Sequence, residues 1–351
     1  MKRFKKLSPH LIVILLFVGI SFAYFSPVLQ GKRLDMPDIK HWKGMSKEVT
    51  DFRAATGEEP LWTNAMFSGM PAYQISTKSN ANLIQYVVKV ISLGIPRPAS
   101  MLFLYLLGFY LLLLSLKVDY RLSAVGAISF AFSSYFFIII MAGHMTKAHA
   151  IAYVPMVVAA VLYTYRGRML LGGVLTAFTV ALELYANHLQ ITYYLVLVLI
   201  LIGIVQFIKD LKANNLPDFA KRSGVLLLAA LLASGTAVTR LSTTMQYGKD
   251  STRGQSELTN NLDNKTSGLD KDYATSWSYG VAETFTLLIP NFYGGASQGA
   301  LTTDSETYNA IKRAPNAKQL IKQLPLYWGT QPFTSGPTYA GAIVMFLFLF
   351  G

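Results

Sequence analysis

Apolar residues are gathered into runs long enough to cross a membrane, and polar residues fill the segments between them. The first run extends from about Leu11 to Leu29. A transmembrane helix needs about 20 mainly apolar residues, and most of the runs approach this length. The pattern therefore predicts an all-α polytopic membrane protein. Beyond the first run, the expected spans are about Ala99–Leu116, Leu122–Ala142, Ala148–Tyr165, Leu170–Ala186, Ile191–Ile208 and Gly224–Leu241.

The alternation of polar and apolar segments predicts five consecutive parts. Residues 1–29 form an N-terminal tail and the first transmembrane helix, and residues 30–98 form a first extracytoplasmic loop. Residues 99–242 form transmembrane helices 2–7, and residues 243–338 form a second extracytoplasmic loop. Residues 339–351 begin a further helix, but this run is too short to span a bilayer. We therefore expect the chain to be the N-terminal part of a longer protein.

The first loop contains two stretches with helical patterns. Ser46 to Ala55 carries its charges on one face. Asn82 to Leu93 is amphipathic, which suits a helix that lies flat in the membrane interface. The Pro96-Arg97-Pro98 group then breaks the chain before the next span.

Charge supports a membrane protein and gives an orientation. The chain has 31 basic and 18 acidic residues, but only 14% of it is charged and 52% is hydrophobic. A nucleic-acid partner is not expected, because such binders place dense basic runs in a polar background. Basic residues fill the N-terminal tail and alternate short links, and this bias marks the cytoplasmic side. We therefore expect the N-terminus, Arg166 and Lys212 to be cytoplasmic, and Asp38 and Gly268 to be outside.

Several chemistries are excluded by residue types or motifs that the sequence lacks. The chain has no cysteine, so it has no disulfide, thiol nucleophile or thiolate metal site. It contains no Walker loop, no Gly-x-Gly-x-x-Gly and no serine nucleophile elbow. An ATP-driven pump is therefore disfavoured. The first apolar run has no clear cleavage site, so we expect it to be a retained helix.

Polar side chains gather at the expected outer ends of the spans. They lie in two short turns, Gly143–Lys147 and Asn187–Gln190, and at the end of the last complete span. A cation there could hold a phosphate group, although it could also snorkel to lipid headgroups. We expect Lys147 and Arg240 to converge on one phosphate. The residues in these places are His144, Lys147, His188, Gln190 and Arg240.

Glu183 lies one turn inside an apolar span, where an unpaired carboxylate is costly. We expect its partner to be a basic or histidine side chain from a neighbouring helix, with His188 and Lys147 as candidates. Such a pair could serve function, or it could hold two helices together, and the sequence leaves both open.

An aromatic segment, Trp62–Tyr73, lies in the first loop. Its Trp62 is followed by Asn64, and aromatic faces with neighbouring amide groups suit a sugar-binding site. The same residue types form the aromatic belt at a membrane interface. The two interpretations are equally consistent with the sequence.

Five motifs in order carry a resemblance to a known family. They are GEEPLWTNAMFSGMPAY, GHMTKAH, NHLQITYY, WSYGVAETFTLLIPNFYGG and YWGTQPF, and they follow an acidic residue just beyond the first span. Together they resemble the bacterial YfhO-type membrane proteins, which are grouped with the GT-C glycosyltransferases. The Trp-Thr-x-x-Met-Phe-x-Gly-Met-Pro form is similar to the Bacteroidetes branch. The resemblance extends from Asp35 to Tyr339.

The resemblance implies a GT-C-like helical bundle in the bacterial inner (cytoplasmic) membrane, in a chain roughly twice as long. It implies an outer-face active site, a polyprenyl-phosphate sugar donor and a glycan or polymer acceptor. It favours Asp38 over Asp35 as the acid that removes the acceptor proton, or that holds a divalent cation such as Mg²⁺ or Mn²⁺. It also implies a role for Glu283, the acidic residue of a Trp-Ser-x-x-x-x-Glu pattern.

Two other classes of function stay open. A lipid-linked sugar flippase or transporter would spread charged residues through the depth of a central cavity, whereas here they gather at the outer ends. A non-catalytic membrane scaffold would need no acid at Asp38. The candidate residues are Asp38 as the catalytic residue and metal ligand, and Lys147, His144, His188, Gln190, Arg240, Trp62, Asn64 and Glu283 as substrate-binding residues.

Overall fold

The computed structural model describes residues 2–76, 81–251, 254, 269, 271–296, 299–332 and 338–351. Gly268, which we expect on the outer side, lies outside these residues. The chain divides into two compact units, Met1–Ser242 and Thr243–Gly351. Each unit is described by itself below.

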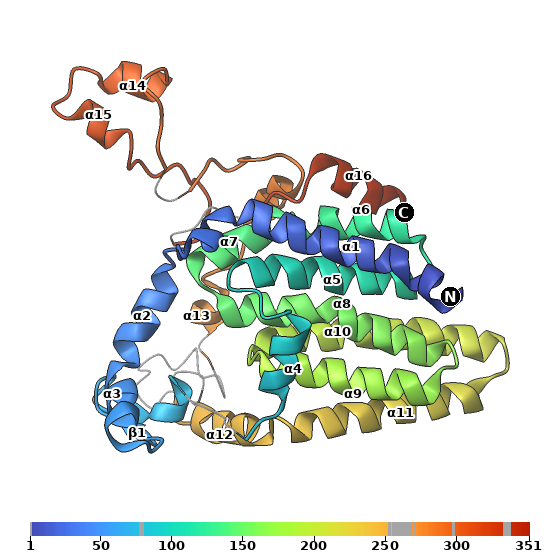
Figure 1. The fold of residues 1–351 in the computed structure, drawn as a ribbon. Coiled ribbons are helices and arrows are strands. Elements are labelled where there is room, and N and C mark those ends of the chain that lie inside the picture. The colour runs from blue at the N-terminus through green and yellow to red at the C-terminus, as the bar shows by residue number, and fades with distance from the viewer. Residues whose placement is uncertain are drawn as a thin grey trace. The chain divides into compact units, whose positions relative to one another are not determined.

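The first unit is a bundle of long apolar helices, which confirms the all-α membrane fold (Figure 1). In the part of the chain that the structure describes, residues Leu7–Tyr24, α8 and α10 are each long and apolar enough to cross a membrane. The number rises to as many as 5 if each of two bent helix pairs is one span. The helices of the bundle are α1 (Lys2–Tyr24), α5 (Ala99–Ser115), α6 (Tyr120–Ala131), α7 (Ser134–Ala142), α8 (Met145–Tyr165), α9 (Met169–Tyr185), α10 (Leu189–Lys212) and α11 (Leu216–Gly235).

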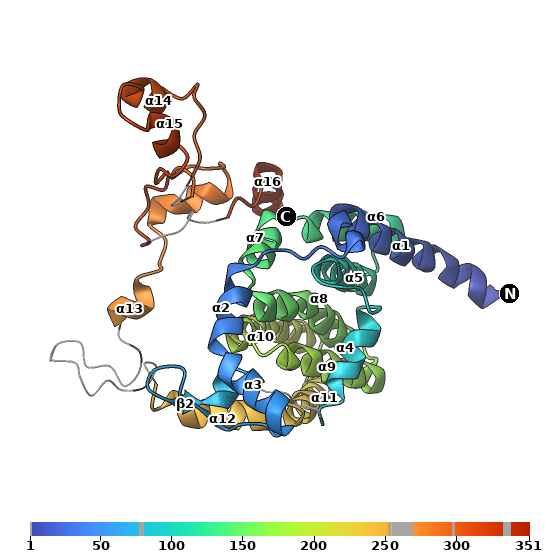
Figure 2. The same cartoon turned by 60° about the vertical axis from the view of Figure 1, so that its left-hand side comes forward.

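Helix α8 lies at the centre, packed against α5 and α9, and α11 packs on α9 (Figure 2). The core is densest along α5, whose first turns are buried on every side. Small residues let the helix backbones approach closely, as is typical of membrane bundles. A Cβ added to Gly108 of α5 would lie 2.6 Å from the Ala152 carbonyl oxygen of α8. A Cβ added to Gly172 of α9 would lie 2.3 Å from the Thr164 hydroxyl.

Two expected spans are broken in the structure. The Leu122–Ala142 run forms α6 and α7, which meet at a bend of 48°. Ser133 interrupts this run, because its extended backbone (φ −58°, ψ 131°) cannot continue a helix. The Gly224–Leu241 run forms the end of α11 and the start of α12 (Val238–Gly248), bent by 78°. Hydropathy averaged over a window does not detect such breaks, because one polar residue, such as Ser133 or Thr236, changes the average little.

The first loop contains more structure than its sequence pattern predicts. The expected helices at 46–55 and 82–93 are present as α3 and α4. An unpredicted helix, α2, carries Asp38 and leads from the α7 end of the bundle toward α3 (Figure 1). The elements are η1 (Ser26–Gln30), α2 (Pro37–Met45), α3 (Lys47–Thr56), β1 (Trp62–Thr63), β2 (Met70–Pro71), η2 (Ala72–Gln74) and α4 (Ile84–Ile91), and β1 pairs antiparallel with β2.

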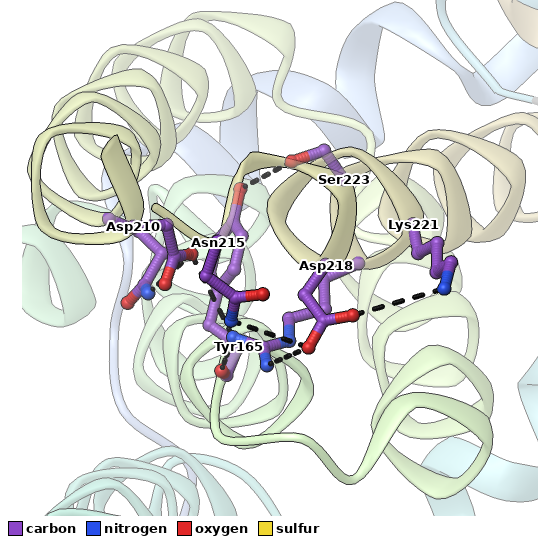
Figure 3. A network of polar contacts seen from close by, with 8 residues as sticks. Tyr165, Asp210, Asn215, Asp218, Lys221 and Ser223 are labelled. Atoms are coloured by element: carbon purple, nitrogen blue, oxygen red, sulfur yellow. Dashed lines mark hydrogen bonds and ion pairs between the residues drawn. The ribbon is translucent and has the colours of Figure 1, made fainter. Parts of the chain in front are cut away.

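A buried polar network joins α8, α10 and α11 at one end of the bundle (Figure 3). Arg222 donates to the Tyr165 carbonyl at 3.0 Å and lies 3.8 Å from the Asp210 carboxylate and 3.4 Å from that of Asp218. The Tyr165 and Ser223 hydroxyls are 3.2 Å apart. We call this the Asp210 end, and the opposite end, where α8 begins and α9 ends, the His144 end.

The second unit consists of short helices and loops. Isolated bridges join Gly294 to Tyr327 and Gly299 to Leu324, so residues 293–296 and 299–301 run beside 321–328. The last helix is short, as the sequence predicts. The elements are α13 (Lys271–Thr275), η4 (Val281–Leu287), α14 (Glu306–Ile311), α15 (Ala317–Leu320) and α16 (Ala342–Phe350).

Candidate functional site

Asp38 contacts His144. Pro37 begins α2, where its fixed φ suits the first helical position, and Asp38 follows in the first turn. The helix dipole favours an acidic residue there. His144 lies between α7 and α8 and directly precedes the first turn of α8. Its Nε2 is 2.9 Å from Asp38 Oδ2, and both side chains are about half exposed. Two of the candidate residues therefore form one pair that can meet a ligand from solvent.

Gly143 explains how α2 comes so close to the turn before α8. It adopts a positive φ of 97°, which side chains with a Cβ rarely allow. A Cβ at this position would also lie 3.2 Å from Asp38 Cβ and from the Ile39 nitrogen. The Gly-His dipeptide thus brings the imidazole to the carboxylate while leaving room for the α2 backbone.

Asp35 has a different environment. Its carboxylate pairs with Lys40 at 2.7 Å, and both side chains are largely exposed. Such surface pairs contribute little to stability and leave the carboxylate solvated. The geometry therefore separates the two acids without reference to any family, since Asp38 contacts a second candidate residue and Asp35 does not.

His188 interacts electrostatically with Lys147 and His144 of the preceding turn. It directly precedes α10, and its Nδ1 is buried without a hydrogen-bond partner among the described residues. Burial lowers the pKa of His188, and the nearby charges of Lys147 and, more weakly, His144 lower it further. These effects all favour the neutral form of the His188 imidazole. The two outer turns expected from the sequence thus face one another.

Arg240 contacts the same α9–α10 turn at Tyr185. Its Nη1 donates to the Tyr185 carbonyl at 3.3 Å, and its guanidinium lies 5.5 Å from the centre of the Tyr185 ring. Both cations therefore interact with the 185–188 turn. The charge of Lys147 affects His188, and Arg240 bonds to Tyr185. This arrangement agrees with the expectation that they serve one ligand, which stays a prediction.

Glu183 does not pair with His188 or Lys147. The buried carboxylate accepts from the Thr192 hydroxyl, which is 3.0 Å from both oxygens. This bond joins the end of α9 to the start of α10, so Glu183 holds two helices together. The expectation of a basic or histidine partner was wrong, because the Thr192 hydroxyl, across the α9–α10 turn, donates to the carboxylate instead.

Gln190 bonds along its own helix. Its side-chain amide donates to the Tyr194 hydroxyl at 2.8 Å, one turn further along α10. Both side chains are exposed at the His144 end. The pair is therefore available to a ligand, but it does not belong to the Asp38–His144 contact.

Trp62 and Asn64 lie in a hairpin held by Glu48 of α3. The Glu48 carboxylate accepts from the Thr63 hydroxyl and from the backbone N–H groups of Asn64 at 3.0 Å and Ala65 at 2.9 Å. The Thr63 bond, together with the two weaker effects of the backbone bonds, lowers the pKa of Glu48 against the opposing effect of burial. Trp62 donates to the Asn64 side chain at 3.2 Å. No described contact brings this hairpin to Asp38 or His144.

Glu283 organises the second unit. Its carboxylate is fully buried and accepts from the Tyr327 hydroxyl at 2.8 Å and from the backbone N–H groups of Gly280 at 3.0 Å and Thr330 at 3.1 Å. Burial raises the pKa of Glu283, but the bonds from Thr330, Tyr327 and Gly280 together bring it below its usual value. Both oxygens are thus occupied by donors of the chain itself, which favours a structural role over substrate binding.

Sequence reasoning missed Arg97, which precedes α5 at the His144 end. Its guanidinium interacts electrostatically with the side chains of Tyr153 on α8, Tyr185 on α9 and His149. The only signal in the sequence was its place between two prolines at the entrance to a span, which had been interpreted as a break in the chain.

The residues around Asp38 do not provide a complete metal site. Asp38 and His144 are ligand types that divalent cations accept. Within the described ranges, however, no group of three or more histidine and acidic residues could hold a metal ion. The divalent cation stays an expectation from the resemblance.

Comparison with known proteins adds no family to this geometry. The function of this chain is therefore inferred from the arrangement and the chemistry of its residues. No protein-family model, no curated protein and no solved structure matches this chain.

Proposed function

We propose that this protein is an integral-membrane glycosyltransferase of the bacterial cytoplasmic membrane. It transfers a sugar from a polyprenyl-phosphate-linked donor to an extracytoplasmic glycan or polymer, with its N-terminus in the cytoplasm and the His144 end outside. The observation that carries the proposal is the 2.9 Å contact between Asp38 and His144. The resemblance of five sequence motifs to YfhO-type proteins supports the same reaction class.

Asp38 acts as the general base in this proposal. The acceptor oxygen forms a bond to the anomeric carbon of the sugar, while the bond from that carbon to the phosphate oxygen breaks. The acceptor proton passes to the Asp38 carboxylate, and the bonding electron pair leaves with the polyprenyl phosphate. A positioned base of this kind contributes about 10²- to 10⁴-fold to rate. His144 holds the carboxylate in place through its Nε2 and leaves the other carboxylate oxygen for the acceptor.

Lys147 and Arg240 stabilise the leaving group. The phosphate gains negative charge as the glycosidic bond breaks, so fixed cations aimed at it favour the transition state over the bound substrate. Both residues act on the 185–188 turn. The charge of Lys147 acts on the His188 imidazole, whose buried Nδ1 has no hydrogen-bond partner among the described residues.

The distribution of charge favours transfer over transport. A transporter places polar groups near the middle of the membrane, between discontinuous helices. Here Lys147 lies in the first turn of α8 and Glu183 in the last turn of α9, both at the His144 end. Asp210 and Arg222 lie at the opposite end. The helix segments between them carry no acidic or basic residue.

The test uses the full-length protein in proteoliposomes with a polyprenyl-phosphate sugar labelled in both sugar and lipid. Transfer produces a labelled acceptor and free polyprenyl phosphate. Transport moves the donor between leaflets with its sugar–phosphate bond intact. Movement of uncleaved donor, with no polyprenyl phosphate formed in the presence of acceptor, would replace the transferase with the flippase.

A further inference from the structure

Arg97 lies at the His144 end and has no hydrogen-bond or ion-pair partner among the described residues. It lies two residues before the start of α5. Its guanidinium has five N–H donors and no acceptor function of its own. Among the residues that the structure describes, none accepts a hydrogen bond from it or forms an ion pair with it, and no carboxylate acts on its charge.

Tyr153 provides a second, independent sign of a missing ligand. Only 1% of the residue is exposed, and its hydroxyl is buried with no hydrogen-bond partner among the described residues. Buried polar groups are nearly always bonded, so such a hydroxyl calls for an explanation. Aromatic side chains on a helix point back toward its N-terminus, which for α8 is the His144 end. The hydroxyl therefore points toward the end at which Arg97 lies, and the charge of Arg97 acts on it.

His149 lies one turn before Tyr153 on the same face of α8. Its Nδ1 bonds to the Met145 carbonyl at 3.0 Å, so that nitrogen carries the proton. The Nε2 atom is left as an acceptor, and the charge of Arg97 acts on this ring as well. A ligand that binds here would thus meet two donors, Arg97 and Tyr153, and one acceptor.

Arg240 brings a second guanidinium to Tyr185, a different tyrosine from Tyr153. It bonds to the Tyr185 carbonyl and stacks near the Tyr185 ring, while the charge of Arg97 acts on Tyr185 from the start of α5. The chemistry of the set, two guanidiniums with a tyrosine hydroxyl, suits the tetrahedral oxygens of a phosphate group.

We propose that Arg97, Tyr153 and Arg240 bind a single phosphate group, with Arg97 as the residue that contributes most to its affinity. Guanidinium groups can hold two phosphate oxygens at once, whereas Lys147 offers only a point charge. The inference rests on the proposed function in one respect, because it takes the phosphate to be that of the polyprenyl donor. A free phosphate ion has the same chemistry and is distinguished by the test.

The test measures binding by the full-length protein in lipid nanodiscs, with three probes. These are a polyprenyl monophosphate, the polyprenol of the same length, and inorganic phosphate. Wild type should bind the lipid phosphate at least tenfold more tightly than the polyprenol, and millimolar inorganic phosphate should not compete. Arg97→Met should remove most of this preference, and Arg97→Lys should restore only part of it. Arg33→Met, an exposed arginine of the same loop, should leave binding unchanged.

Tyrosine variants give a readout that does not depend on loss of charge. Tyr153→Phe removes one hydroxyl and should weaken binding of the lipid phosphate several-fold. Tyr105→Phe is the matched control, because its hydroxyl is also buried without a partner but no cation acts on it. Neither change removes a hydrogen bond that the described chain makes, so both variants should fold.

The results separate this site from the proposed reaction. Wild-type affinity in Arg97→Met, or equal binding of polyprenol and polyprenyl phosphate, would overturn the site. Binding of inorganic phosphate as tight as that of the lipid would overturn the donor as its ligand. If wild type binds the lipid phosphate through Arg97 yet transfers no sugar, the site stands and the glycosyltransferase fails. If sugar is transferred and Arg97→Met binds normally, only the site fails.

Discussion

Replacing Arg222 by methionine should destabilise the bundle more than any other single loss of charge at the Asp210 end. Arg222→Met keeps much of the apolar stem and removes the charge. Among the described residues, the Asp210 carboxylate, whose side chain is 8% exposed, then keeps only its 2.8 Å bond from Gln206. The Tyr165 carbonyl at the end of α8 also loses the guanidinium that donates to it at 3.0 Å.

The expected loss follows from these contacts. A hydrogen bond to a charged group contributes about 1.5–3 kcal/mol, and removing one partner of a buried ion pair costs about 3–5 kcal/mol. The Arg222–Asp218 pair is 44% exposed on the acidic side and adds little. Because these effects overlap, we expect Arg222→Met to lower the free energy of unfolding by about 3–5 kcal/mol.

Lys221→Met is the matched control from the adjacent residue. Its ammonium is 3.9 Å from Asp218, and its side chain is 68% exposed, so the loss should stay below about 1 kcal/mol. Reversible unfolding of both variants in mixed micelles, followed by far-UV circular dichroism, gives the comparison. Equal stability of the two variants would refute the reasoning, because burial would then add nothing to the Arg222 contacts. Adding Asp210→Asn to Arg222→Met should recover part of the loss.

Three further predictions concern the second unit, the phosphate and the topology. Glu283 has a lowered pKa, so its contribution to the stability of the second unit is present above the usual glutamate pKa and is lost as pH falls through the pKa of the folded state. Hydrogen exchange of the 280–330 amides should show this loss of stability, and Glu283→Ala should abolish its pH dependence. Lys147→Met and Arg240→Met should each weaken donor turnover by about 1–3 kcal/mol, and a single-turnover double-mutant cycle should be non-additive. With an impermeant thiol reagent on intact cells, cysteine at Asp38 should react and cysteine at Arg166 should not.

The apolar spans could be predicted from the sequence because burial in lipid demands long runs of apolar residues. The bends could not, because they depend on single residues such as Ser133, whose extended backbone breaks one run into α6 and α7. Hairpin β1–β2 was missed for a related reason. It is held by Glu48, a residue 14 positions before Trp62, and no local pattern signals that contact.

Sequence alone placed His144, Lys147, His188, Gln190 and Arg240 at one end of the bundle but did not show which side chains pair. The Asp38–His144 contact needs α2, which the pattern did not predict, and it needs Gly143 to make room for that helix. Glu183 was given the wrong partner because sequence spacing does not reveal how the Thr192 side chain turns. Arg97 was missed because its importance comes from a buried hydroxyl that lies far from it in the chain.

Single-turnover formation of polyprenyl phosphate by the full-length protein is the most direct test of the role proposed for Asp38. Wild type, Asp38→Asn and Asp35→Asn are compared at saturating donor and acceptor, with equal amounts of folded protein in the membrane. Loss of a positioned general base predicts a rate about 10²- to 10⁴-fold lower in Asp38→Asn. Asp35→Asn should keep the wild-type rate, because its carboxylate pairs only with exposed Lys40. A wild-type rate in Asp38→Asn would contradict the proposed mechanism.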